Sequence, residues 1–137
     1  MQIIKHAVPA MAALLLSASA ALAGTPPALY TSAQAKAGAD VYTQSCAMCH
    51  GADMKGSAGP ALLGQSFAAA GSGSTIGSVF STIAQQMPQT APGSLSQTQY
   101  EDVMAYILQA NGYPAGGSAL VYKDSLASTV PLVSQVK

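Results

Sequence analysis

The sequence predicts a small all-α protein made of a single domain, and three observations support this fold class. Three segments carry apolar residues at three- and four-residue spacing, which is the period of a helix that packs on one face. The 13 glycines and 8 prolines fall mostly between these segments, where they favour turns. No internal repeat is visible, and a length of 137 residues suits one domain. We therefore expect three main helices joined by glycine-rich loops.

Residues 1–23 have the pattern of a secretory signal peptide. A short basic start at Lys5 and His6 precedes an apolar, alanine-rich run that ends in the cleavage-site pattern Ala21-Leu22-Ala23. The run is short for a membrane span, and Pro9 interrupts it. We expect cleavage after Ala23, export to the periplasm and no membrane span in the mature protein.

The first helix is expected from Ser32 or Gln34 to about Cys46, after an extended lead-in at residues 24–34. Apolar and small residues recur there at helical spacing, namely Ala35, Gly38, Val41, Tyr42 and Ser45. A glycine in the middle of a helix costs stability relative to alanine. Gly38 therefore indicates a point where another helix comes close.

A second helix is expected from Ser74 or Thr75 to about Gln86. Its apolar stripe contains Ile76, Val79, Phe80 and Ile83. The helix should end at Met87, because the residue before a proline is disfavoured in the α conformation and Pro88 follows.

The third predicted helix begins at Ser96 and has the clearest start and stop signals. Ser96 and Gln99 form a capping box, and Gly112 is typical of the residue that follows a helix. The apolar face is broad and consists of Tyr100, Val103, Met104, Ile107 and Leu108. Residues 115–137 show no strong period, so we expect a peripheral C-terminal tail with one short helical turn near residues 124–128.

The chain carries little charge, since charged residues make up only 7% of it. Residues 24–137 hold four lysines and five acidic residues, which gives a net charge of about −1. No basic patch is present, so nucleic acid is excluded as a partner. Long-range electrostatic steering of other partners should be weak.

Residues 46–50 read Cys-Ala-Met-Cys-His, and Cys46 and Cys49 are the only cysteines. C-x-x-C-H is the attachment signature of c-type haem. The spacing places both sulfur atoms on one side of a helical turn, and His50 then points at the metal. The motif predicts thioether bonds from Cys46 and Cys49 to one haem c and an axial bond from His50 to its iron. Export agrees with this interpretation, because bacteria attach haem to thiols outside the cytoplasm.

Three other uses of the motif are weaker. A thioredoxin-like redox pair would stand near a strand–helix–strand pattern, which the sequence lacks, and would leave His50 unexplained. A structural zinc site needs four Cys or His ligands, whereas residues 24–137 offer three. A buried pair of structural cysteines is the remaining alternative.

The second axial ligand cannot be a histidine, because His50 is the only one after residue 23. Met48 lies within the motif, and Met54 follows His50 too closely to reach the opposite face. Met104 fits the apolar face of the third helix as ordinary core filling. Met87 ends a helix in a polar segment, so it is the favoured ligand. An empty or water-bound position is the main competitor.

His/Met ligation would raise the reduction potential, because a soft thioether favours ferrous iron. Iron with two protein ligands has no free position for a substrate. This predicts an electron carrier and not an enzyme. An open position would instead indicate a gas sensor or a peroxidase-like enzyme.

The chain resembles class I cytochromes c over about residues 35–112, and we take residues 35–114 as the cytochrome c domain. The resemblance is carried by Gly38, Tyr42 and Cys46 at the family's spacing, by Gly59-Pro60-Ala61-Leu62, and by Met87-Pro88. It implies a cytochrome c fold in which three main helices and glycine-rich loops surround one covalently bound haem.

The same resemblance implies roles for residues around the haem. The Pro60 carbonyl would accept a hydrogen bond from the His50 ring and fix its orientation, and Leu62 would pack on the haem. Residues 102–107 resemble the family's C-terminal helix, where Val103 and Tyr106 would meet Gly38 and Tyr42.

A narrower resemblance is to the cytochromes that accompany quinoprotein (PQQ-dependent) alcohol dehydrogenases. It is carried by Met87-Pro88, Pro92-Gly93-Ser94-Leu95-Ser96 and Asn111-Gly112-Tyr113-Pro114. It implies a periplasmic monohaem carrier that moves single electrons between a dehydrogenase and a respiratory acceptor. The acceptor would be a terminal oxidase or another cytochrome, and the chain would be a free carrier or a subunit of the dehydrogenase complex.

Overall fold

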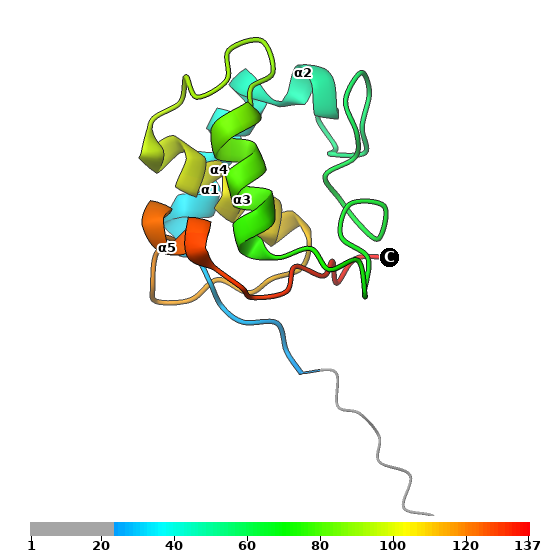
Figure 1. Cartoon of the computed structure of the whole chain (residues 1–137), viewed down its shortest axis with the longest axis vertical. Helices are drawn as coiled ribbons and strands as arrows, with labels where there is room; N and C mark the ends of the chain where they lie inside the picture. The colour runs from blue at the N-terminus through cyan, green and yellow to red at the C-terminus, as the bar shows by residue number, and fades with distance from the viewer. Residues whose placement is uncertain (1–23) are drawn as a thin grey trace, which may run out of the picture.

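The structure is a computed structural model that describes residues 24–137. The signal peptide expected at residues 1–23 lies outside the described residues. The described part contains helices and no strand, in the order α1 (Ser32–Ser45), α2 (Ala47–His50), α3 (Ile76–Gln86), α4 (Gln97–Ala110) and α5 (Tyr122–Ala127) (Figure 1). The predicted all-α fold with three main helices is confirmed.

Each of the three long helices begins with a capping box. The side chain of the residue before the helix accepts a hydrogen bond from an N–H of the first turn, and the backbone N–H of that capping residue donates one in return. The pairs are Thr31 with Gln34, Thr75 with Ser78, and Ser96 with Gln99. The local sequence therefore fixes where α1, α3 and α4 begin.

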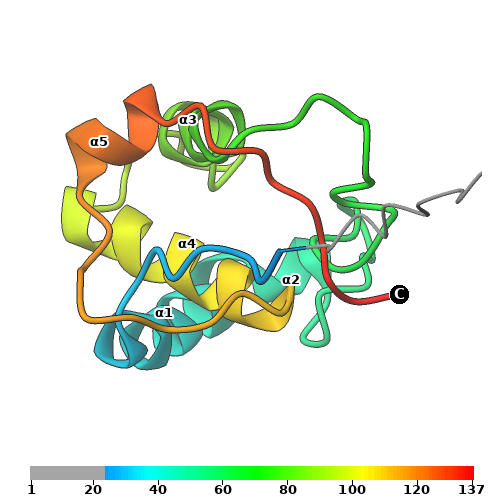
Figure 2. The same ribbon diagram turned by 90° about the horizontal axis from the view of Figure 1, so that it is seen from below.

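The crossing of α1 and α4 is the most extensive contact between helices. At its centre, a Cβ atom on Gly38 would overlap the backbone carbonyl group of Asp102. Beside it, the rings of Tyr42 and Tyr106 pack with their centroids 5.5 Å apart. Figure 2 shows α4 lying between α1 on one side and α3 with α5 on the other. The missing side chain of Gly38 lets the backbones of α1 and α4 approach closely.

Buried apolar side chains form two clusters. The larger contains residues of α3, α4 and both ends of the described chain, among them Tyr30, Phe80, Met104, Leu108 and Leu132. The smaller contains Tyr42, Met54, Val103 and Ile107. Phe67 and Ile83 are partly buried and pack against both clusters. These two side chains therefore connect the two halves of the core.

Residues 115–137 are not the peripheral tail that the sequence suggested. Leu120 and Leu132 are buried in the larger cluster. The Leu132 N–H donates to the Ser74 carbonyl at 2.9 Å, and the Ile76 N–H donates to the Val130 carbonyl at 2.8 Å. Isolated pairings of this kind leave no local period in the sequence, so no sequence pattern predicts them. The predicted helical turn is present as α5 and begins two residues earlier than expected.

The lead-in before α1 is also anchored in the core. Tyr30 is 1% exposed, and its hydroxyl donates to the Tyr113 carbonyl at 2.7 Å. The Gln34 side chain donates to the Leu120 carbonyl at 3.0 Å and accepts from the Leu120 N–H at 2.9 Å. The start of α1 and the segment before α5 are thus joined across the fold.

Candidate haem site

The C-x-x-C-H motif forms a single helical turn at the end of α1. The Cys46 N–H still donates to the Tyr42 carbonyl at 2.9 Å, and the Cys46 carbonyl then accepts from the N–H groups of Cys49 at 3.1 Å and His50 at 3.0 Å. Both cysteines are partly buried and are not joined in a disulfide. The turn of α2 brings Cys46, Cys49 and His50 together on consecutive positions of one short element.

The His50 ring is held in one orientation by a backbone carbonyl. Its Nδ1 atom lies 2.7 Å from the Pro60 carbonyl oxygen, and the residue is only 9% exposed. A carbonyl oxygen can only accept, so Nδ1 carries the ring proton. The other ring nitrogen, Nε2, then keeps a lone pair, which is the form of histidine that binds a metal.

The loop at residues 56–60 wraps around α2 through backbone hydrogen bonds. The Gly56 N–H donates to the His50 carbonyl at 2.8 Å, and the Gly59 N–H donates to the Cys49 carbonyl at 2.7 Å. A Cβ atom on Gly59 would lie 3.1 Å from Cε1 of the His50 ring, closer than ordinary packing allows. Glycine at position 59 therefore leaves room for the imidazole.

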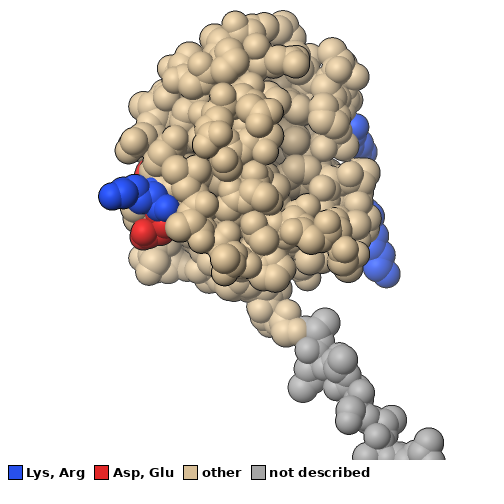
Figure 3. Space-filling model, in the orientation of Figure 1, with Lys and Arg blue, Asp and Glu red and all other residues tan. Residues whose placement is uncertain are grey.

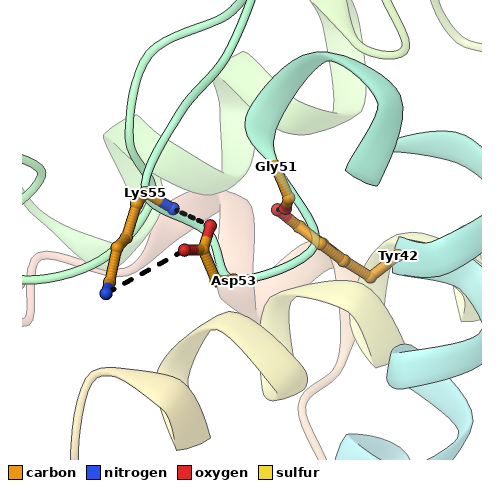
Figure 4. A network of polar contacts seen from close by, with 4 residues as sticks. All are labelled: Tyr42, Gly51, Asp53 and Lys55. Atoms are coloured by element: carbon orange, nitrogen blue, oxygen red, sulfur yellow. Dashed lines mark hydrogen bonds and ion pairs between the residues drawn. The ribbon is translucent and has the colours of Figure 1, made fainter.

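α1 holds the other end of this turn through a tyrosine. The Tyr42 hydroxyl donates to the Gly51 carbonyl at 2.7 Å, directly after His50 (Figure 4). Burial, with smaller effects of Cys46, Tyr106 and Asp53, raises the pKa of Tyr42 to about 12, so the hydroxyl stays protonated and remains a donor at neutral pH. Figure 4 also shows Asp53 close to Lys55, with the Lys55 Nζ 3.9 Å from a carboxylate oxygen.

Hydrogen bonds hold both the backbone N–H and the backbone carbonyl of Leu62. Its N–H donates to the Met54 carbonyl at 2.8 Å, and its carbonyl accepts from the side-chain amide of Asn111 at 2.9 Å. The Asn111 side chain also accepts from the Gly64 N–H at 3.0 Å. The side chain of Leu62 is partly buried and packs against the smaller cluster.

The four methionines of the described chain have distinct environments. Met104 is fully buried in the larger cluster, and Met54 is 2% exposed in the smaller one. Met48 is 82% exposed. Met87 is partly buried, belongs to neither cluster, and directly follows α3. Of the four, only Met87 is partly buried and lies outside both apolar clusters.

A second tyrosine fixes the backbone at Met87. The hydroxyl of Tyr100, which is 2% exposed in α4, donates to the Met87 carbonyl at 2.8 Å. The Met87 N–H donates to the Ile83 carbonyl at 3.2 Å. In Figure 1, α2 and the C-terminal end of α3 lie at the same end of the molecule. In the sequence, Tyr100 is part of an apolar helix face, and no neighbouring residue signals this role.

The arrangement argues against the alternative uses of the cysteines. Burial, and to a smaller extent Cys49, raises the pKa of the Cys46 thiol to about 11. Thiol redox enzymes need a lowered pKa that yields a reactive thiolate. Within residues 24–137, no three His, Cys, Asp or Glu side chains are grouped so that they could hold a metal ion. A covalently attached haem fits this donor set better, because it needs two thiols and one imidazole with a free Nε2.

Comparison with known proteins assigns a family. The sequence matches the family described as "Cytochrome C oxidase, cbb3-type, subunit III" over residues 33–107, more than half of the chain. The chain belongs to this cytochrome c family. Membership implies haem c as the cofactor and haem-based electron transfer. No curated protein matched the sequence significantly.

One solved structure shows that this cytochrome c fold recurs elsewhere. The match is to the crystal structure of the sulfane dehydrogenase SoxCD from Paracoccus pantotrophus, with a TM-score of 0.54 and 21% identity. It covers 74% of this cytochrome and 53% of that chain. The cytochrome therefore spans about half the length of its structural neighbour, and the likeness concerns the fold alone.

Proposed function

We propose that this protein is a periplasmic monohaem c-type cytochrome that transfers single electrons through an iron held by His50 and Met87. The Cys46 and Cys49 sulfur atoms would attach the haem. The observation that carries the proposal is the His50 ring, whose Nδ1 is engaged by Pro60 and whose Nε2 keeps its lone pair. Haem, when bound, supplies an iron atom that gains or loses one electron.

The residues around the two proposed ligands restrict the movement of these ligands. The hydrogen bond from His50 to Pro60 fixes the ring and increases its basicity as a ligand. Tyr100 holds the backbone of Met87, and Leu62 supplies an apolar side chain beside the smaller cluster. A site that moves little when one charge is added or removed suits electron transfer.

Met87→Ala tests the ligand assignment, with Met48→Ala as the matched control because Met48 is exposed. In the ferric holoprotein, Met87→Ala should remove the charge-transfer band of sulfur ligation and lower the reduction potential by on the order of 100 mV. Met48→Ala should change neither. An unchanged spectrum and potential in Met87→Ala would remove Met87 from the proposal.

The competing function is a gas sensor or peroxidase-like enzyme with an open iron position. Carbon monoxide separates the two functions, because it needs an open position on the ferrous iron. The reduced wild-type protein should bind it slowly, and Met87→Ala should bind it fast. Fast binding by the wild type would favour the open-site function.

We propose export as well, with residues 1–23 removed after Ala23. None of the helices within residues 24–137 has both the length and the hydrophobicity needed to cross a bilayer. Protein isolated from the periplasm should begin at Gly24 and keep its colour in acid acetone, since thioether-bound haem is not extracted. A retained leader or an extractable pigment would contradict these two assignments.

We propose a dehydrogenase as electron donor and a terminal oxidase or another cytochrome as acceptor. A quinoprotein alcohol dehydrogenase is the donor favoured by the resemblance of residues 87–116. A purified quinoprotein alcohol dehydrogenase with ethanol should reduce the ferric holoprotein within its turnover time. Absence of reduction, while the protein accepts electrons from dithionite, would exclude this donor class.

A further inference from the structure

Residues 56–100 contain no Asp, Glu, Lys, Arg or His. This stretch includes Pro60, which holds His50, and Met87, the second proposed ligand. It also includes α3, which lies at the front of Figure 1. Figure 3 shows the same face as a space-filling surface, and charged atoms are visible only near its margins. The face that α3 covers in this view is therefore almost free of charge.

The nearest charges along the chain are either paired with an opposite charge or partly buried. Asp53 and Lys55 precede the stretch and have opposite signs, with their charged groups 3.9 Å apart. Glu101 and Asp102 follow the stretch and are both partly buried. The Glu101 carboxylate accepts from the Tyr122 N–H at 2.7 Å. The two ends of the stretch therefore add one exposed pair of opposite charges and two partly buried acids.

Exposed groups beside the two proposed ligands are apolar or neutral. Met48, between the two cysteines, is 82% exposed. The loop at residues 57–60 exposes Ser57, Ala58 and Pro60, and the segment at residues 85–94 exposes Gln89, Thr90 and their neighbours. α2 and the C-terminal end of α3 lie at the same end of the molecule (Figure 1). We call Met48 with residues 57–60 and 85–94 the neutral surface.

We propose that redox partners dock on the neutral surface, and that each partner presents an uncharged surface around its own redox centre. A charged partner surface would lose hydration against this one without gaining an opposite charge in return. An uncharged partner surface avoids that cost. The inference rests on the proposed function, and it adds the chemistry of the partner and the place of contact.

Electron self-exchange between the oxidised and reduced holoprotein provides a test with a partner of known surface, a second copy of the chain. The wild-type rate should change less than about three-fold between ionic strengths of about 10 mM and about 500 mM. Gln89→Lys and Gln89→Glu each place like charges on both copies. Both should slow self-exchange by about five-fold at low ionic strength, with recovery at high ionic strength.

Hexacyanoferrate(III), a small anionic oxidant, separates charge from structural damage. Gln89→Lys should speed oxidation by this anion, whereas Gln89→Glu should slow it. Ser118→Lys and Ser118→Glu are the controls, because Ser118 is exposed and belongs to the loop between α4 and α5. In Figure 1 this loop runs along the opposite end of the molecule from α2. The Ser118 variants should match the wild type in both assays.

A steep dependence of wild-type self-exchange on ionic strength would overturn the inference, as would Ser118 variants that behave like the Gln89 variants. These failures are distinct from failure of the proposed function. That failure would show as absence of covalent haem, or as an unchanged spectrum in Met87→Ala. An unchanged spectrum in the Gln89 variants verifies that their iron ligands are intact.

Discussion

The loop after His50 and the loop that begins at Met87 are each anchored by a tyrosine hydroxyl, but they differ in the other bonds that hold them. Tyr42 of α1 donates to the carbonyl after His50, and Tyr100 of α4 donates to the Met87 carbonyl. The loop after His50, the His50 side, is also joined to α2 by hydrogen bonds of Gly56, Gly59 and Pro60. The loop that begins at Met87, the Met87 side, has the last backbone bond of α3 and turn bonds within the loop itself, such as that from the Ala91 N–H to the Pro88 carbonyl at 2.8 Å.

This difference separates a proposed ligand fixed by its sequence neighbours from a proposed ligand fixed by a distant helix. The hydrogen bonds made directly to His50 and to its turn come from α1 or from the following ten residues. The Met87 backbone depends on Tyr100, and so on the position of α4. With the proposed ligands, we expect the iron to lose the Met87 sulfur more readily than the His50 imidazole when the fold is perturbed.

Gly38→Ala should have the largest effect, because it disturbs the scaffold that carries both tyrosines. The added Cβ would overlap the Asp102 carbonyl group. Because this group is part of the α4 backbone, relieving the overlap requires a shift of the helix. We expect the free energy of unfolding to fall by about 3 kcal/mol. Unfolding of the holoprotein in guanidinium measures this free energy. Gly117→Ala is the control, since no atom lies within 4 Å of its Cβ position, and an equal loss there would refute the explanation.

Asn111→Ala should weaken the His50 side at its far end. The Asn111 side chain is fully buried and bonds the Leu62 carbonyl and the Gly64 N–H. Its loss leaves buried backbone groups without partners, which should cost about 2–3 kcal/mol of unfolding free energy. Hydrogen exchange at the Gly64 amide should speed up together with this loss. Unchanged protection of that amide would contradict the assigned role.

Tyr100→Phe should loosen the Met87 side alone. One hydrogen bond to the Met87 carbonyl is lost, worth about 1 kcal/mol. A free-energy loss of this size makes the population without the sulfur ligand about five-fold larger. Carbon monoxide should therefore bind the reduced protein about five-fold faster. Tyr42→Phe is the matched variant. Equal acceleration by both would show that the two sides are not held differently.

Asp102→Asn should have the smallest effect. Burial, and then the nearby Glu101, raises the pKa of the Asp102 carboxyl above its usual value. A raised pKa means that the folded state favours the protonated acid, so wild-type stability is lost as pH rises through that pKa. Asp102→Asn should thus be slightly more stable than wild type at neutral pH and equal to it below about pH 4. Unfolding curves at both pH values check the sign.

Patterns within short stretches of the sequence predict the helices and the part of the candidate site around Cys46, Cys49 and His50. The Ser96–Gln99 capping box, the Pro88 stop and the C-x-x-C-H turn each lie within a few residues, so the sequence alone predicts them. The Gly38 contact was also predictable, because a glycine in mid-helix implies close approach of another helix.

Other contacts between distant residues could not be predicted. Tyr100 lies on an apolar helix face, and nothing nearby shows that its hydroxyl meets Met87. Asn111 next to a glycine looks like an ordinary helix end, although it is fully buried. Leu132 has no apolar period around it, yet it completes the larger cluster. In each case the partner lies elsewhere in the chain, and only the folded structure brings the two together.

The sharing of Phe67 and Ile83 by both apolar clusters affects how the molecule opens. With both side chains in place, we expect the two clusters to melt in one cooperative transition. If this link were cut, the cluster that holds the C-terminal segment could open by itself in the native state. The cooperativity of the fold would then depend on two side chains that are themselves only partly shielded from water.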